Sequence, residues 1–295
     1  MPSEERQANR WRMLSVLTYG GAHLIWRRLI LCTTIVLALA YSVILIAVIW
    51  LEVSQGLNLA LNFALNLTWL LLSITTYIIF WALVIALIFT LGKDSVFNTL
   101  SFVAIWLLLV VLIPASLQLY LGYKYQQQPA LHATLQQRMV MNDGWDKPQQ
   151  QMFSQFGLRY PAYQHFTLPD EAGNWEWYYA QQHMSDIAVE EQWQAYLQQN
   201  KQRFDELQSL SWLSPSLTLQ LGFNQLAGTS SQAHLQYLQN VASYHQHIRE
   251  YLYVHLYKAL PVSQNSLSQY PRFSSKWSGS LNWHRFIPLI LMLLG

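Results

Sequence analysis

The run LILCTTIVLALAYSVILIAVIWL at residues 29–51 has twenty-three residues and no formal charge. Two more uncharged runs follow, residues 59–91 with thirty-three residues and residues 96–122 with twenty-seven. About twenty apolar residues, at ~1.5 Å of helix each, cross a hydrocarbon core of roughly 30 Å. A buried helix of a soluble protein would carry a polar stripe, which these runs mostly lack. The sequence therefore predicts an all-α membrane protein with three full transmembrane helices within residues 29–122.

The remainder of the chain has a different composition. Residues 123–283 are polar, rich in Gln and aromatic side chains, and carry most of the charges, so the mean hydropathy of +0.14 averages two unlike parts. The net charge of +2, without a Lys/Arg cluster, argues against nucleic acid as a partner. The single cysteine, Cys32, can form no internal disulfide.

The segment before the first run carries an excess of positive charge. Residues 1–28 hold Glu4 and Glu5 against five arginines, at positions 6, 10, 12, 27 and 28. Such a flank is typical of the cytoplasmic side of a membrane. Counting three crossings from there, we expect residues 123–283 to lie outside the cytoplasm.

Periodic apolar residues predict that this polar part is mostly helical. The four-residue spacing of Leu131, Leu135 and Met139 predicts a continuation of the third helix, which Asn142-Asp143-Gly144 should break. An irregular loop is expected at 157–175.

Farther along, the pattern predicts one long amphipathic helix at 177–210. Ser214 as N-cap and Pro215 at the first helical position predict the start of the next helix, with a stop at Gly228. A last helix of the polar part should begin at Thr229 or Ser230 and end before Pro261.

The chain turns apolar again at residues 284–295. Twelve residues give about 18 Å of helix, which is shorter than a membrane span. The segment is therefore either re-entrant or the beginning of a fourth transmembrane helix. We expect the second, a partial last helix.

Three amides share one face of the second run, because Asn58, Asn62 and Asn66 follow one another at four-residue spacing. Amides in hydrocarbon need partners, so this face should meet another helix, the lipid head groups or a wet cavity. These residues are candidates for lining the helix bundle, either as contacts between helices or as part of a substrate path. In the third run, Pro114 should kink the helix.

The sequence shows no pattern typical of an enzyme active site. Gly92-Lys93-Asp94-Ser95 resembles the end of a phosphate-binding P-loop, but the required earlier glycine is missing and Asp94 replaces the hydroxyl. No H-E-x-x-H or G-x-S-x-G occurs. We therefore expect no catalytic residue, no cofactor and no nucleotide site in this chain.

Histidines are frequent in the polar part. Four of them, His234, His245, His247 and His255, fall on one predicted helix, and His183 lies elsewhere. On a helix, residues 245 and 247 point about 200° apart, and residues 234 and 245 are ~16 Å apart along the axis. We therefore favour structural or solvated histidines over a metal site or a pH sensor, and predict no metal.

Four aromatic residues cluster at Trp175, Trp177, Tyr178 and Tyr179. They could form a hydrophobic ligand shelf or a membrane-surface anchor. They could equally belong to the core, which large aromatic side chains usually supply. We favour the core.

Several separated segments resemble ABC-2 type transporter permeases. Ser3-Glu4-Glu5-Arg6-Gln7-Ala8-Asn9, followed by Trp11-Arg12-Met13-Leu14-Ser15, resembles the cytoplasmic segment of that family that contacts the ATPase subunit. Later landmarks resemble, in order, a bacterial subgroup with a large extracytoplasmic helical domain before its last transmembrane helix. They are Gly92-Lys93-Asp94-Ser95 before Asn98, 106–114, 212–217, 224–229, His234, Tyr244-His245 and Tyr270-Pro271-Arg272-Phe273.

The resemblance implies a permease subunit of an ATP-driven ABC exporter in the bacterial inner membrane. Its partners would be a separate ATPase subunit, contacted through Glu4, Glu5 and Arg12, a second permease copy or paralogue, and membrane lipid. The alternative is a membrane-anchored scaffold whose outer domain binds a protein or an envelope lipid.

Family members also carry a helix and an outer region ahead of the coupling segment, so we expect the chain to be truncated at both ends. The predicted parts are a coupling segment at 1–28, a transmembrane bundle at 29–122, an extracytoplasmic helical domain at 123–283 and the start of a last transmembrane helix at 284–295.

Overall fold

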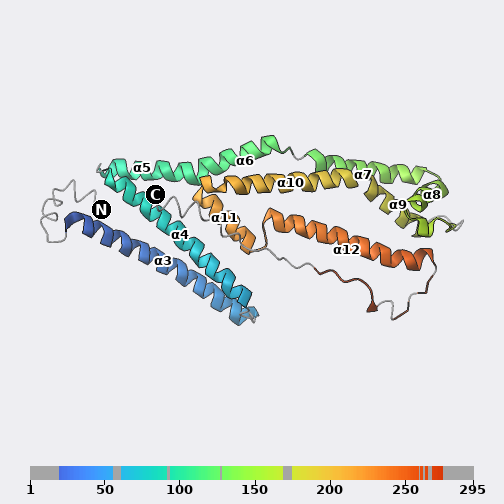
Figure 1. Cartoon of the computed structure of the whole chain (residues 1–295), viewed down its shortest axis with the longest axis horizontal. Helices are drawn as coiled ribbons and strands as arrows, with labels where there is room; N and C mark the ends of the chain where they lie inside the picture. The colour runs from blue at the N-terminus through green and yellow to red at the C-terminus, as the bar shows by residue number, and fades with distance from the viewer. Residues whose placement is uncertain are drawn as a thin grey trace. The chain divides into compact units, whose positions relative to one another are not determined.

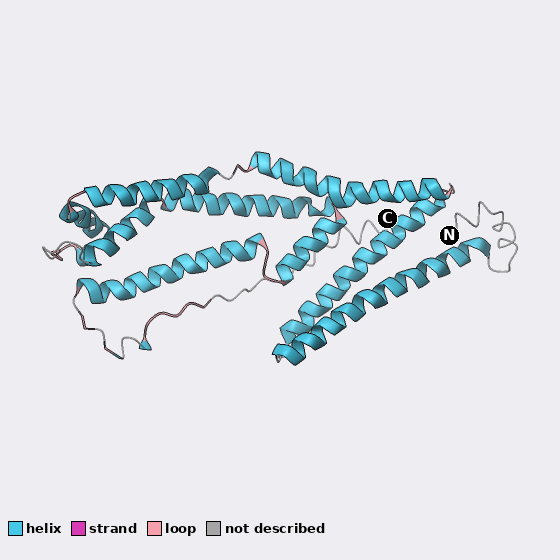
Figure 2. Cartoon of the chain, turned by 180° about the vertical axis from the view of Figure 1, so that it is seen from behind, coloured by secondary structure: helices cyan, strands magenta, loops and turns pink. Residues whose placement is uncertain are grey.

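A computed structural model describes residues 20–55, 61–91, 94–126, 128–168 and 175–258, with the short stretches 260–261, 263–264 and 268–274. Every regular element in these residues is a helix, which confirms the all-α prediction (Figure 2). In chain order the elements are α3 (Gly20–Gln55), α4 (Leu61–Thr90), α5 (Ser95–Leu107), the π-helix η1 (Leu108–Leu112), α6 (Ile113–Lys124), α7 (Gln128–Asp146), α8 (Gln149–Arg159), the 3-10 helix η2 (Pro161–Tyr163), α9 (Trp175–Ala188), α10 (Glu190–Leu210), the 3-10 helix η3 (Ser211–Leu213), α11 (Pro215–Leu226) and α12 (Ser231–Tyr257).

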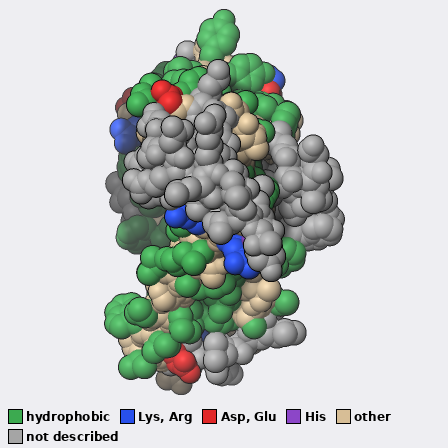
Figure 3. Space-filling model, turned by 90° about the vertical axis from the view of Figure 1, so that its left-hand side faces the viewer, with side chains coloured by type: hydrophobic (Ala, Val, Ile, Leu, Met, Phe, Trp, Pro, Cys, Tyr) green, Lys and Arg blue, Asp and Glu red, His purple; other side chains and the backbone are tan. Residues whose placement is uncertain are grey.

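Three helical stretches are long and apolar enough to cross a membrane, namely Trp26–Ser54, Phe63–Thr90 and Ser95–Lys124. They coincide with the three predicted runs, so the chain is a multi-pass membrane protein. The apolar side chains of α3 are largely exposed, as lipid-facing side chains must be; Val43 and Ile46 are each 66% exposed. Figure 3 shows hydrophobic side chains over much of the described surface on the face viewed, with few charged ones. The predicted partial helix at 284–295 and residues 1–19 of the coupling segment lie outside the described residues.

Two compact units divide the described chain. The first contains the residues up to Tyr120 together with Glu206–Ser230, and the second contains those of Leu121–Asp205 and Ser231–Ser278. The segment Glu206–Ser230, which we assigned to the polar domain at 123–283, therefore groups with the transmembrane helices. The domain boundaries proposed from the sequence otherwise stay a prediction.

In the first unit, α3 and α4 lie side by side (Figure 1). The Tyr41 hydroxyl on α3 hydrogen-bonds with the Thr75 hydroxyl on α4. Between α4 and α5, the rings of Trp81 and Phe102 meet edge to face with centroids 5.7 Å apart. Polar and aromatic side chains thus contribute contacts between helices whose surface is otherwise mostly apolar.

The third span is interrupted by the π-helix η1. In this register an N–H bonds to the carbonyl five residues earlier, as the Ile113 N–H does to the Leu108 carbonyl. Pro114 follows and has no N–H to donate to the Leu109 carbonyl in the same register. The hydroxyl of Ser214 donates to that carbonyl instead, with Oγ and O 2.6 Å apart. Where the sequence predicted a kink at Pro114, the structure therefore has a wider π-helical turn just before the proline, and the Ser214 hydroxyl donates to the carbonyl that the proline leaves without a backbone donor.

The same serine begins α11, as the sequence predicted. Ser214 Oγ accepts a hydrogen bond from the Leu217 N–H, Pro215 is the first helical residue, and Gly228 beyond the end has φ 68°. The left-handed φ favours glycine at this stop. α11 packs against α4 and η1, so this short helix belongs to the transmembrane helices.

The second unit has an aromatic core formed by α8, α9 and α12. Phe153, Phe156, Trp177, Tyr253 and Tyr257 are at most 5% exposed and belong to one cluster. The ring of Phe156 meets that of Tyr253 edge to face at 5.6 Å between centroids. Burial of such large rings dominates the stability of a helical domain of this size.

Four expectations for this unit were wrong. The third helix does not continue into the polar part, since α6 ends at Lys124 and α7 begins at Gln128. The irregular loop expected at 157–175 is helical up to Arg159 and again at Pro161–Tyr163. α7 does not break at Asn142–Gly144 but continues to Asp146, because Gly144 is buried against α9, where a Cβ atom would collide with the Gln181 side chain. The helix expected at 177–210 is two helices, α9 and α10, separated at Val189. Val189 is 7% exposed, so the chain turns there to bury it.

Candidate ligand-binding cleft

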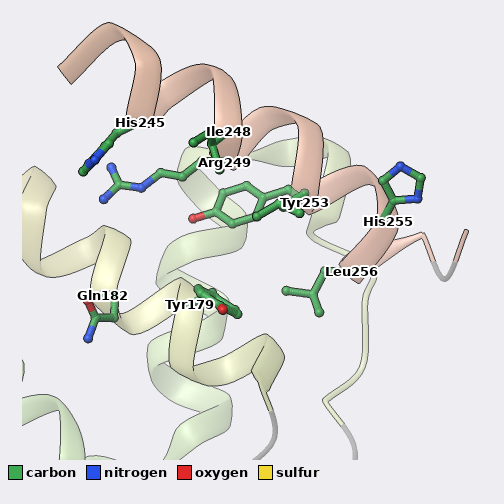
Figure 4. Close-up of a pocket in the computed structure, with 9 residues that line it drawn as sticks. Tyr179, Gln182, His245, Ile248, Arg249, Tyr253, His255 and Leu256 are labelled. Carbon is green, nitrogen blue, oxygen red and sulfur yellow. The ribbon is translucent and has the colours of Figure 1, made fainter. Parts of the chain in front are cut away.

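A cleft of about 490 Å³ lies between α9 and α12 in the second unit (Figure 4). Its volume falls in the range of small-molecule sites, roughly 300–1,000 Å³. Most of its lining surface is apolar. The spacing of the residues on α12 decides which of them face the cleft.

One wall of the cleft is aliphatic. Ile248, Leu252 and Leu256 follow one another at four-residue spacing on α12 and therefore share a face. Tyr179 on α9 lies across from Leu256 (Figure 4). Leu252 is 37% exposed and Tyr179 is 43% exposed, so this wall keeps apolar surface open to solvent.

The other end of the cleft is polar. His245 and Arg249 lie there together on α12, and Gln182 lies at the same end on α9 (Figure 4). An Arg249 N–H donates to the carboxylate of Asp186, whose Oδ1 also accepts from Gln137 Nε2 at 2.6 Å. The two helices are thus linked by an ion pair that fixes the guanidinium at the polar end. A guanidinium carries five N–H donors, so one carboxylate uses only part of them.

Behind the cleft, His183 joins two tyrosines. Its Nε2 is 3.0 Å from the Tyr160 hydroxyl, and its Nδ1 is 2.7 Å from the Tyr253 hydroxyl. Burial and the nearby positive charge of Arg249 lower the pKa of His183 to about 4. Burial likewise raises the pKa of Tyr253 above its ordinary value. At neutral pH His183 and Tyr253 are therefore uncharged, and their hydrogen bond holds the Tyr253 ring at the floor of the cleft.

The region that carries this cleft matches one protein-family model. Residues 130–276 match the family described as Domain of unknown function (DUF3526). The DUF3526 match includes the whole cleft, the His183 network and Ser214, and none of the three apolar spans. No curated protein and no solved structure matches the chain. The resemblance to ABC-2 permeases stays a prediction, since this match concerns the polar part alone.

Three histidines of the DUF3526 region differ in their surroundings. His183 is 3% exposed and fully bonded, which agrees with the structural role that we favoured. His245 and His255 line the cleft. Among the described residues, no group of three His, Cys, Asp or Glu side chains is arranged to hold a metal ion.

The four clustered aromatic residues also divide. Trp177 is 2% exposed and belongs to the core, whereas Trp175 is 65% exposed. Tyr179 lines the cleft. The core interpretation is therefore confirmed for Trp177, and the ligand shelf stays a prediction for Tyr179.

The remaining candidate residues keep their status as predictions. Glu4, Glu5, Arg12 and Asn58 lie outside the described residues. Asn62 is part of α4, and Asn66, one turn later, is exposed. The sequence offered no signal for Tyr160, Arg249 and Asp186, because their pairing depends on helices that are distant in the chain.

Proposed function

We propose that the chain is a membrane-spanning permease subunit of an ATP-driven ABC exporter, working with a separate ATPase subunit and without an ATPase site of its own. The observation that supports this most is the construction of the third span. A simple anchor needs only an apolar helix, whereas this span has a π-helix, a proline and a docked serine near its middle. π-Helical turns inside α-helices are frequent at functional sites.

In this proposal the subunit resides in the bacterial inner membrane, with residues 123–283 on the extracytoplasmic side except for Glu206–Ser230, which groups with the transmembrane helices. Residues 1–28 form the coupling segment, and Glu4, Glu5 and Arg12 contact the ATPase. A second permease copy or paralogue completes the bundle, and Asn58, Asn62 and Asn66 line it. The positive charge of residues 1–28 supports this orientation.

Purification of the tagged full chain from its native membranes tests the proposal. We expect an ABC ATPase to be recovered with the wild-type chain. Charge reversal in the variant Glu4→Lys/Glu5→Lys should abolish that recovery, because like charges would then face the ATPase contact. The matched control Asp143→Lys/Asp146→Lys reverses two charges in the second unit and should recover the ATPase as well as wild type does. A wild-type chain that brings down no ATPase contradicts the proposal.

The cleft favours a second candidate function. A membrane-anchored scaffold that binds an envelope lipid or a protein would also need an open apolar wall beside a fixed charge, which the α9–α12 cleft provides. The two functions differ in the purification experiment. A scaffold recovers its ligand or protein partner in wild type and in the Glu4→Lys/Glu5→Lys variant alike, without an ATPase.

A further inference from the structure

We propose that the α9–α12 cleft binds an anionic single-chain amphiphile. The acyl chain lies along Ile248, Leu252 and Leu256, and the head group, a carboxylate or a phosphate, binds at Arg249 and His245. This proposal concerns the DUF3526 region alone and does not depend on an ATPase partner.

The distribution of polarity along the cleft supports an amphiphile. Its aliphatic stripe runs from Ile248 to Leu256, a distance of about 12 Å along α12. The polar side chains of Arg249 and His245 lie at one end of that stripe, whereas His255, beside Leu256 at the other end, is bonded through Nδ1 to the Leu260 carbonyl (Figure 4). A wholly apolar ligand would leave the remaining N–H donors of the guanidinium without a partner on the ligand, and a wholly polar one would leave the aliphatic stripe in contact with water.

The sign of the head group follows from the charges at the polar end. Arg249 carries a permanent positive charge, and one of its guanidinium nitrogens is paired with the Asp186 carboxylate. Gln137 also donates to Asp186, so the carboxylate is engaged on two sides. The remaining N–H donors of the guanidinium suit a carboxylate or a phosphate, which accept charge-assisted hydrogen bonds from arginine. His245, one turn earlier, adds a further donor.

The floor of the cleft fixes its shape before any ligand arrives. Tyr253, at the floor, is bonded through its hydroxyl to His183, which in turn bonds to Tyr160. The Arg249–Asp186 pair ties α12 to α9 at the polar end. A cleft preformed in this way loses little conformational entropy on binding, which favours a small ligand over a segment that must fold as it docks.

A competition experiment on the purified full chain, reconstituted in phosphatidylcholine nanodiscs, tests the proposal. The probe is a fluorescent undecanoic acid, and nanodiscs without protein give the background from partitioning. We expect saturable binding that dodecanoate and dodecyl phosphate displace and that dodecyltrimethylammonium does not. The head group is assigned from the concentration needed for half-displacement: a lower value for dodecanoate identifies a fatty-acid site, and a lower value for dodecyl phosphate identifies a phosphate-headed lipid as the source. Equal displacement by the cationic amphiphile overturns the proposal.

Two pairs of variants locate the site. His245→Glu places a negative charge at the polar end and should weaken probe binding about tenfold, whereas His247→Glu, about 200° around α12, should change it less than about twofold. Leu252→Trp fills the aliphatic stripe and should weaken binding about tenfold, whereas Gln239→Trp adds the same bulk at an exposed position elsewhere on α12 and should not. Near-UV circular dichroism checks that each variant is folded. Wild-type affinity in His245→Glu, which alters an exposed side chain, would overturn the proposal even if Leu252→Trp failed to fold.

Discussion

At the scale of single residues, His183 makes stability depend on pH. Its folded pKa of about 4 lies below the ordinary value of 6.5, so the unfolded chain binds a proton more readily. Folding therefore loses stability as the pH falls from about 6.5 towards 4, and the loss from this group approaches about 3 kcal/mol. Well above pH 6.5 both states are neutral at this position and the effect vanishes.

We expect the full chain to unfold at a markedly lower temperature at pH 5 than at pH 7.5, measured by thermal scans in detergent. His183→Gln should be less stable than wild type at pH 7.5 but show a smaller loss on acidification, because no buried imidazole remains to be protonated. The control His247→Gln, at an exposed position, should follow the wild-type curve. An unchanged pH dependence in His183→Gln would assign the effect to other groups.

Gly144 gives a second prediction at this scale. Alanine would improve helix propensity by about 1 kcal/mol. Its Cβ atom would displace Gln181, whose Nε2 donates to the Met141 carbonyl at 2.6 Å, and losing a buried hydrogen bond costs about 1–3 kcal/mol, with overpacking added. We expect Gly144→Ala to lower the unfolding temperature. Gly122→Ala, where nothing lies within 4 Å of the added atom, should leave it unchanged or raise it.

Gly144 also shows why sequence reasoning failed at that point. Asn-Asp-Gly is a common turn sequence, and from local preference alone a helix should stop there. The glycine serves instead a contact with α9, about forty residues farther along, and no local pattern encodes that contact. For the histidines the sequence favoured a structural or a solvated role without deciding between them, and the tyrosine partners of His183, at the end of α8 and on α12, were not foreseeable from spacing.

At the scale of elements, local signals predicted the start and end of α11 but not its environment. Ser214, Pro215 and Gly228 are cap and stop residues that act within a few positions, and the structure uses them as expected. The second role of Ser214, as donor to the Leu109 carbonyl, joins residues 105 positions apart. The polar composition around α11 placed it outside the transmembrane bundle, whereas it packs against α4 and η1.

This contact predicts an energetic coupling. Ser214→Ala removes the donor to Leu109 and should cost about 1–3 kcal/mol of unfolding free energy, partly through the lost cap on Leu217. Pro114→Ala restores a backbone N–H in the third span. In the double variant the loss should be smaller than the sum of the two single losses, since the restored N–H can bond to Leu109.

Thermal unfolding of the four proteins in one detergent measures the coupling as a double-mutant cycle. Ser209→Ala serves as the control, because the Ser209 hydroxyl bonds within its own helix to Glu206 and is exposed. Strict additivity of Ser214→Ala and Pro114→Ala would show that the proline and the serine act independently.

At the scale of the whole molecule, hydropathy was sufficient to find the membrane spans. Charge-free apolar runs longer than twenty residues are typical of membrane-spanning helices, and all three appear as helices. Hydropathy could not show that Glu206–Ser230, within the polar region, belongs to the first unit. Polar side chains of this segment can be buried there because they are hydrogen-bonded within the segment itself. The Thr218 hydroxyl, for example, donates to the Ser211 carbonyl at 2.7 Å.

The proposed orientation gives a prediction at this scale. In a Cys32→Ser background, Asp143→Cys should react with a membrane-impermeant maleimide added to cells with a permeable outer membrane, since we place residues 123–283 outside the cytoplasm. Lys93→Cys should react only after the inner membrane is lysed. The reverse pattern would place the polar part inside the cell and contradict the orientation set by the arginines of residues 1–28.

The bond from Ser214 to Leu109 also has a consequence for biosynthesis. A ribosome adds roughly 5–20 residues per second, so the serine emerges about 5–20 s after the carbonyl that it will cap, given the 105 residues between them. During that interval the third span is complete, yet one of its backbone carbonyls, near the middle of the thirty-residue stretch, awaits its donor. We therefore expect assembly of the membrane part in two stages, in which the arrival of α11 supplies the missing donor to a helix inserted earlier. Nascent chains arrested before residue 214 should be more open to protease and to quality control than those arrested after α11.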